Sequence, residues 1–152
     1  MYQKGRGVKR DYAKAMKWYK EAAKQKLPLA QNNIGTLYRK GWGVKRNHLK
    51  AMKWYRKAAK KGHALAQKNL GDMYRKWRGI KRDIPKAVKW YRSSAEKGEA
   101  WGQFRLGSMY EKSVGTPKNA AKATEWYRKA ATQGLETAQI ALRKLETRSS
   151  RQ

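Results

Sequence analysis

The pair Trp-Tyr recurs through this chain of 152 residues at a constant interval of 36 residues. It stands at Trp18-Tyr19, Trp54-Tyr55, Trp90-Tyr91 and Trp126-Tyr127. A fixed period of about 20–50 residues is typical of repeat architectures, in which each unit buries its apolar face only by stacking on its neighbours. The period therefore predicts a solenoid with an extended binding surface rather than an enzyme built around one cleft.

Residues that begin and end helices recur with the same period. Between Asp11 and Lys24, apolar residues follow one another at helical spacing with lysines between them, as on an amphipathic helix. Residues favoured at helix N-caps stand at Asp11, Asn47, Asp83 and Asn119, and glycines suited to the end of a helix stand at Gly62, Gly98 and Gly134. We predict helices, named B, near residues 11–25, 47–61, 83–97 and 119–133.

The segments between the B helices predict a second set, named A. In residues 64–76, the apolar side chains Ala66, Leu70, Met73 and Tyr74 share one helical face. We expect A helices near residues 28–40, 64–76, 100–112 and 135–146. Glycine inside a helix costs about 0.5–1 kcal/mol relative to alanine, so its recurrence at one position indicates a close crossing by a neighbouring helix. These glycines are Gly35, Gly71 and Gly107.

Two further motifs connect the chain to a known family. The segments Ile34-Gly35-x-x-Tyr38, Leu70-Gly71-x-x-Tyr74 and Leu106-Gly107-x-x-Tyr110 match half of the tetratricopeptide signature. With the Gly-x-Gly-Val-Lys-Arg connection and the Lys-Ala-x-Lys-Trp-Tyr-x-x-Ala-Ala helix, residues 1–146 resemble the Sel-one-like repeat (SLR) family. The resemblance implies an all-α, right-handed α-solenoid of antiparallel helix pairs that serves as a non-enzymatic scaffold for protein–protein interaction. Members of this family are often exported in bacteria or luminal in eukaryotes.

We expect one repeat domain at residues 1–146, with about four units of which the first lacks most of its A helix, and a polar tail at residues 147–152. No run of 18 apolar residues could span a membrane, and the sequence starts without the apolar stretch of a signal peptide. The compartment therefore stays open. The absence of cysteine excludes disulfides and thiolate metal sites, and it separates this chain from the cysteine-rich SLR proteins of some bacteria.

Charge is the other outstanding property of the sequence. Lys and Arg number 39 against 10 acidic residues, which gives a net charge of +29 and a pI near 10.6. Self-repulsion of this size opposes a compact state, and few acidic residues are interspersed to reduce it. Part of the charge follows from lysines and arginines at helix C-termini and on solvated faces. The connections between A and B helices add a periodic set that predicts a polyanion-binding ridge: Lys9, Arg10, Lys45, Arg46, Lys81 and Arg82.

The sequence leaves three explanations of this charge open. The first is an acidic protein or peptide lying in the groove of the solenoid. The second is nucleic acid bound without sequence preference, because duplex DNA rewards any dense cationic surface and no sequence-reading motif is present. Trp42 and Trp77, in A–B connections, would be stacking platforms for bases in that case, or packing residues at the repeat edge. The third is charge without a binding function, from redesign or compositional drift.

Signals for chemistry are few. His48 and His63 occupy unrelated repeat positions without acidic residues at ligand spacing, so we expect neither a metal nor a cofactor. Ser94-Ala95-Glu96-Lys97 spells the Ser-x-x-Lys of penicillin-binding enzymes, and some SLR proteins have been called β-lactamases. The partner motifs of those enzymes are missing, and the other repeats have alanine in place of Ser94. We expect a packing residue and no enzyme, with a weak β-lactamase-like activity as the disfavoured alternative.

Two further expectations concern the inner groove and the N-terminal edge. Some tetratricopeptide modules clamp a peptide carboxylate with residues from successive A helices, and similar offsets here hold Asn33, Lys68, Asn69 and Arg105. Asp72, where that pattern prefers Asn, would repel such a ligand. At the N-terminal edge, an apolar border is expected to mark a truncation or to support self-association. The residues of this border are Tyr2, Trp18, Tyr19 and Ala22.

Overall fold

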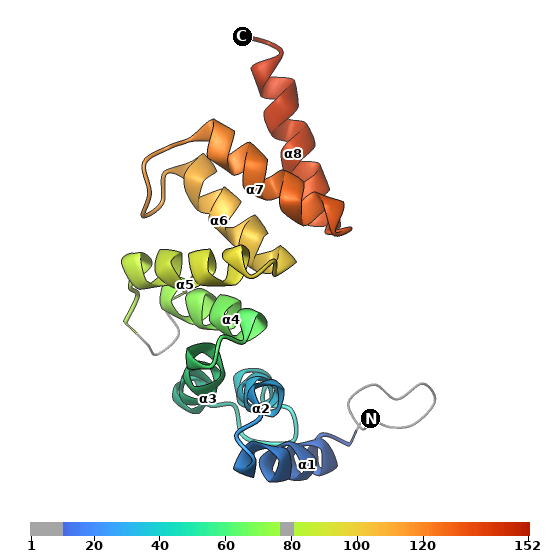
Figure 1. Ribbon diagram of the computed structural model, residues 1–152. Helices are drawn as coiled ribbons and strands as arrows, with labels where there is room; N and C mark the ends of the chain where they lie inside the picture. Colours follow the sequence, from blue (N-terminus) through green and yellow to red (C-terminus); the bar gives the residue numbers. More distant parts are fainter. Residues whose placement is uncertain (1–10, 77–80) are drawn as a thin grey trace.

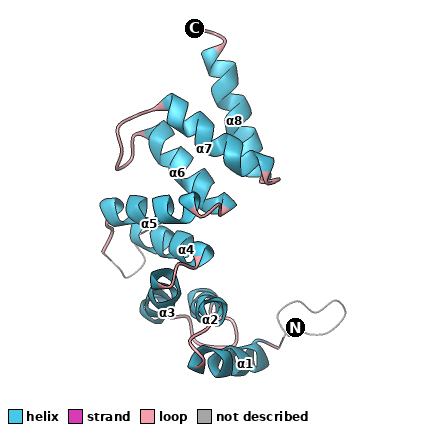
Figure 2. Cartoon of the chain, in the orientation of Figure 1, coloured by secondary structure: helices cyan, strands magenta, loops and turns pink. Residues whose placement is uncertain are grey.

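The computed structural model describes residues 11–76 and 81–152, in which helices and the loops that join them are the only elements (Figure 2). The B helices are α1 (Tyr12–Lys24), α3 (His48–Lys60), α5 (Ile84–Glu96) and α7 (Ala120–Thr132). The A helices are α2 (Pro28–Lys40), α4 (Ala64–Arg75), α6 (Ala100–Lys112) and α8 (Glu136–Ser149). The predicted all-α solenoid of helix pairs is confirmed.

The helices stack in chain order, with α1 and α8 at opposite ends of the array (Figure 1). The helices α2, α4 and α6 each pack against the B helices that precede and follow them, and α8 packs against α7. In addition, α4 contacts α6. One boundary differs from the expectation, because α8 continues to Ser149 through residues assigned to a polar tail. The Thr147 hydroxyl donates to the Arg143 carbonyl over 2.9 Å, which supports the additional helical turn.

Local signals place the helix ends as the sequence predicts. Each cap side chain of the B helices accepts a hydrogen bond from the backbone N–H three residues later, at 2.9–3.0 Å. The glycines that follow three B helices have positive φ, a conformation that L side chains rarely adopt. The cap residues are Asp11, Asn47, Asp83 and Asn119, and the glycines are Gly62, Gly98 and Gly134.

Within each helix pair, the tyrosine of the Trp-Tyr motif lies on the glycine of the A helix. A Cβ added to Gly71 would lie 2.7 Å from the Tyr91 ring and 3.3 Å from the Ala87 carbonyl oxygen. The other pairs repeat this contact, and all three tyrosines are fully buried. The predicted close crossing is therefore confirmed. These pairs are Gly35 with Tyr55, Gly71 with Tyr91, and Gly107 with Tyr127.

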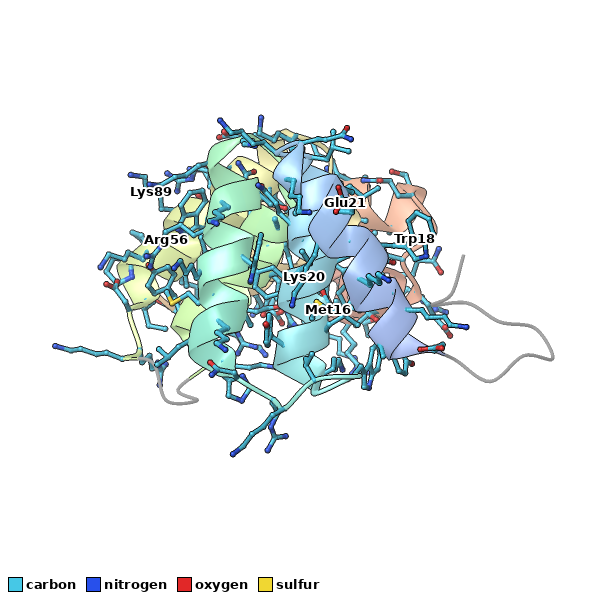
Figure 3. The ribbon with its side chains drawn as sticks, turned by 90° about the horizontal axis from the view of Figure 1, so that it is seen from below. Met16, Trp18, Lys20, Glu21, Arg56 and Lys89 are labelled. Atoms are coloured by element: carbon cyan, nitrogen blue, oxygen red, sulfur yellow. The ribbon has the colours of Figure 1, made fainter. Side chains whose placement is uncertain are left out.

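The tryptophans of the motif lie nearer the surface than their tyrosine neighbours. Trp54, Trp90 and Trp126 are half-buried and pack against the core. Trp18 is 63% exposed and projects from α1, whereas Met16 of the same helix is buried with Ile34 and Leu37 (Figure 3). The Trp-Tyr pairs thus contribute to the core mainly through Tyr55, Tyr91 and Tyr127.

Candidate functional site

Successive A helices are linked by polar side chains on one side of the array, which we call the inner face. Between α2 and α4, Asn69 Nδ2 donates to Asn32 Oδ1 over 3.0 Å. Between α4 and α6, Arg105 Nε lies 3.1 Å from Asp72 Oδ1. Between α6 and α8, Arg148 Nη1 lies 3.5 Å from Glu111 Oε1. Because neighbouring A helices approach each other here, this is the concave side of the stack.

Asp72 is the centre of the polar cluster on the inner face. Its carboxylate lies 3.1 Å from Lys68 Nζ and 3.1 Å from Arg105 Nε, and it accepts a hydrogen bond from the Tyr91 hydroxyl over 2.7 Å. The side chains of Lys68, Asp72 and Arg105 keep only 14%, 20% and 25% of their exposure. Burial alone would raise the pKa of Asp72, but attraction to Lys68 and Arg105 and the Tyr91 hydrogen bond hold it below its ordinary value.

This cluster contains two of the four residues predicted to clamp the carboxylate of a ligand. Lys68 and Arg105 do come together, but the carboxylate between them belongs to Asp72 of the chain itself. Asn69 is buried and donates to Asn32, and Asn33 makes no hydrogen bond to the cluster within the described residues. The internal carboxylate therefore occupies the place that the clamp hypothesis gives to a ligand.

An exposed apolar row also follows the inner face. Leu29, Leu65 and Trp101 are 60%, 37% and 38% exposed and stand at the same position of α2, α4 and α6. Each lies four residues before Asn33, Asn69 or Arg105, and residues with this spacing share one face of a helix. Sequence reasoning missed this row, although the helical spacing from the polar positions was sufficient to find it.

The bases of the A–B connections lie partly within the described chain. Lys45 and Arg46 between α2 and α3, and Lys81 and Arg82 between α4 and α5, are exposed. Lys9 and Arg10 lie outside the described residues. The structure adds Arg75 and Lys112, which line a cavity with Arg82 and Arg105 between the ends of α4 and α6. Arg75 and Lys112 are the last residues of α4 and α6, where cations are favoured by the helix dipole.

Other cations have a role within the fold. Arg56 donates to the Tyr74 hydroxyl over 3.1 Å, and Arg92 donates to the Tyr110 hydroxyl over 3.2 Å. Lysines of the B helices also lie over the tyrosine rings of the preceding A helices, at 5.3–5.6 Å from the ring centroids. Such contacts contribute about 0.5–1 kcal/mol each at exposed sites. These lysines are Lys50, Lys86 and Lys122.

The residues considered for stacking and metal binding have structural contacts. Trp42 stacks on Tyr12 with ring centroids 4.9 Å apart, so it packs at the repeat edge, and Trp77 lies outside the described residues. His63 Nδ1 accepts the Ala66 N–H at the start of α4, and burial lowers the pKa of His63. Within residues 11–76 and 81–152, no three His, Cys, Asp or Glu side chains are placed to hold a metal ion.

No described helix has the length and apolar character needed to cross a bilayer.

Ser94 is fully buried between α5 and α6. Its hydroxyl donates to the Ala64 carbonyl over 2.7 Å, and its Cβ lies 2.7 Å from the position that a Cβ on Gly102 would take. The neighbouring repeats have alanine at both positions of this crossing. The larger serine is thus accommodated by the smaller Gly102, as expected for a packing residue.

Comparison with known proteins agrees with this architecture. The Sel1 repeat family model matches residues 1–27, 28–63, 64–99 and 102–135. The chain belongs to the Sel1 repeat family. No curated protein matches the chain. Proteins of the Sel1 repeat family are generally non-enzymatic scaffolds that mediate protein interactions.

Solved Sel1 repeat structures share the fold over most of the chain. A protective antigen of uropathogenic Escherichia coli with an SLR fold is 43% identical, with a TM-score of 0.82 over 93% of this chain and 30% of its own. A Sel1 repeat protein from Oxalobacter formigenes is 37% identical, with a TM-score of 0.85 over 93% of this chain and 56% of its own. The chain thus spans less than two-thirds of either protein.

Cysteine is not required for this Sel1 repeat fold. The Helicobacter pylori cysteine rich protein B is 26% identical and has a TM-score of 0.69, over 89% of this chain and 97% of its own. The present chain has no cysteine and builds the same helix pairs from buried tyrosine, glycine and alanine.

Proposed function

We propose that this Sel1 repeat chain binds an extended acidic segment of a partner protein along its inner face. The observation that carries the proposal is the combination, on one face, of an exposed apolar row and uncompensated basic groups. The row is formed by Leu29, Leu65 and Trp101. Arg82 and Lys112 are exposed beside the same A helices and make no ion pair within the described residues.

Each part of this surface has a distinct task in the proposed complex. Exposed apolar side chains aligned over several repeats are typical of interaction sites, and they supply the apolar contact area. The basic groups complement carboxylates of the segment, which accelerates association and selects against basic partners. The proposal keeps the acidic segment in the groove, one of the alternatives that the sequence left open, and adds the apolar row with Arg82 and Lys112 as its contacts.

Catalysis is not part of the proposal. Ser94, the residue of the β-lactamase-like alternative, is fully buried and its hydroxyl is engaged with the Ala64 carbonyl. A nucleophile needs access to its substrate and a base within hydrogen-bond reach. Non-enzymatic binding is therefore the function we assign.

The test compares ligands and variants in one binding assay. Labelled acidic peptides with interspersed leucines, matched basic peptides and generic duplex DNA are titrated with the protein, and fluorescence anisotropy is read over a salt series. The double variant Leu65→Ser and Trp101→Ser should weaken acidic-peptide binding about tenfold or more, because each removes apolar contact area. The matched control is Leu49→Ser, which alters an exposed leucine of a B helix and should leave affinity unchanged.

Two outcomes would contradict the proposal. Duplex DNA would be the better explanation if its affinity falls by about 10³ between 50 and 200 mM salt and does not respond to the Leu65 and Trp101 substitutions. Absence of binding to every ligand at 50 mM salt would leave the charge without a binding function.

A further inference from the structure

A small cavity of about 250 Å³ lies between the ends of α4 and α6. The side chains that line it come from α4, from the α4–α5 connection and from α6 with the loop that follows. Four of the lining residues are basic and none is acidic. The described lining consists of Arg75, Arg82, Arg105, Ser108, Met109, Lys112 and Val114.

Two of the arginines contact groups of the chain itself through Nε, Arg75 by a hydrogen bond and Arg105 by an ion pair. Arg75 Nε donates to the Tyr91 hydroxyl over 3.2 Å, Tyr91 donates to Asp72 over 2.7 Å, and Arg105 Nε lies 3.1 Å from Asp72 Oδ1. Within the described chain, the Nη amino groups of both arginines make no hydrogen bond. Guanidinium groups placed in this way keep both Nη amino groups, with four N–H donors each, for a ligand, and they lose less side-chain freedom on binding than free arginines.

Internal charges compensate only part of this cluster. Asp72 pairs with Lys68 as well as with Arg105. Even if its whole charge is assigned to Arg105, the positive charges of Arg75, Arg82 and Lys112 remain without an acidic partner among the described residues. The Tyr91 hydroxyl, which bridges Arg75 and Asp72, is uncharged at neutral pH like any tyrosine, and burial raises its pKa further above the ordinary value. It therefore supplies no negative charge to the cluster.

Equivalent positions in the neighbouring repeats differ. One repeat later, Glu111 replaces Arg75, accepts the Tyr127 hydroxyl over 2.6 Å and pairs with Arg148 at 3.5 Å. One repeat earlier, Asn69 replaces Arg105. Arg39, Arg46 and Lys76 stand one repeat before Arg75, Arg82 and Lys112, so three of the four cations recur there and Arg105 is the addition. The full set of four cations is therefore particular to the junction of α4 and α6 in the described chain.

From this arrangement we infer that the cavity binds a phosphoryl group, a tetrahedral oxyanion, between Arg75, Arg82, Arg105 and Lys112. A phosphoryl group carries about −1.5 to −2 charges and three acceptor oxygens at pH 7, so it matches this cluster better than a carboxylate does. The cavity is also smaller than the roughly 300–1,000 Å³ of pockets for larger ligands. The inference rests on the proposed function in one respect: the group would be carried by a side chain of the bound acidic segment.

Two measurements test the site. Inorganic phosphate is titrated at constant ionic strength while the backbone amide signals of Ser108 and Val114 are followed by NMR. In parallel, calorimetry compares an acidic peptide that contains phosphoserine with the same peptide containing serine or glutamate. We expect saturable phosphate binding, competition by sulfate but not by chloride, and a preference for the phosphopeptide of about tenfold or more, since each charge-assisted bond is worth about that factor.

The variants separate the cavity from general charge. The double variant Arg82→Gln and Lys112→Gln changes residues without hydrogen bonds in the described structure, and it should abolish phosphate saturation and the phosphopeptide preference. Its matched control, Arg46→Gln with Lys118→Gln, removes the same charge at the adjacent repeats and should preserve both. Circular dichroism verifies that both double variants fold.

Each result decides between the inference and the proposed function. Equal losses of phosphate binding in the two double variants, or no saturation by phosphate, would contradict phosphoryl binding in the cavity. Neither result would contradict the binding of acidic peptides along the inner face. Saturation by phosphate without preference for the phosphopeptide would support the anion site and reject its occupation by the bound segment.

Discussion

The substitution Asp72→Asn tests whether the Asp72 carboxylate stabilises this strongly basic fold. The change keeps the size of the side chain and removes the carboxylate that pairs with Lys68 and Arg105 and accepts the Tyr91 hydroxyl. Both cations are largely buried, so they would be left without their counter-charge. We therefore expect the substitution to lower the free energy of unfolding, although it removes a partly buried charged group.

The magnitude follows from these contacts. A hydrogen bond to a charged group contributes about 1.5–3 kcal/mol, of which a neutral bond to the Asn oxygen keeps about 1 kcal/mol. Each ion pair lies between the roughly 0–1 kcal/mol of exposed pairs and the 3–5 kcal/mol lost when a buried pair is broken. Because the side chains keep some exposure, we expect Asp72→Asn to lower the free energy of unfolding by about 2–4 kcal/mol near neutral pH.

The pH dependence makes the prediction specific. The pKa of Asp72 is depressed in the folded state. Its contribution is therefore present above the unfolded-state value, about 3.9, and is lost as the pH falls through the folded pKa. Urea unfolding followed by circular dichroism should show a large difference between wild type and variant at about pH 7 and almost none at about pH 2.

Asp83, which caps the next helix of the array, provides a control. Asp83→Asn also replaces an aspartate, but Asn47 and Asn119 cap the equivalent helices in other repeats with the same hydrogen bond. This variant should unfold at nearly the same urea concentration as the wild type. The reasoning on Asp72 is refuted if its variant matches the Asp83 variant near neutral pH, or if its destabilisation persists unchanged at about pH 2.

Three further substitutions test the packing and the surface. Gly71→Ala should destabilise by about 1–3 kcal/mol in thermal unfolding despite the better helix propensity of alanine, because its Cβ would lie 2.7 Å from the Tyr91 ring; unchanged stability would contradict the close crossing. Ser94→Ala should cost about 0.5–1.5 kcal/mol for the lost bond to Ala64, and mass spectrometry should find no β-lactam adduct on the wild type; a serine-dependent adduct would restore the enzyme hypothesis. Trp18→Lys should dissociate any assembly built on the exposed N-terminal edge, as measured by light scattering, and an assembly that survives it must use another surface.

The helices and their crossings could be predicted from the sequence because their causes are local or repeated. Asp83 caps α5 through a hydrogen bond to a residue three positions later, and Gly98 accepts positive φ whatever packs around it. The contact of Gly71 with Tyr91 is long-range, but the 36-residue period marked it in three copies. These signals are the backbone preferences of residue types and the repeat period, and both can be read directly from the sequence.

The charged site depended on the tertiary structure instead. Asp72, Lys68 and Arg105 come from two helices, and their pairing turned a predicted ligand clamp into an internal ion pair. The cavity between α4 and α6 also depends on Arg105, whose place Asn69 takes one repeat earlier, and on how these two helices pack, which the period does not specify. The reason is physical: a side-chain charge acts over several ångströms in every direction, and its partner is set by the packing and rotamers of neighbouring helices rather than by spacing along the chain.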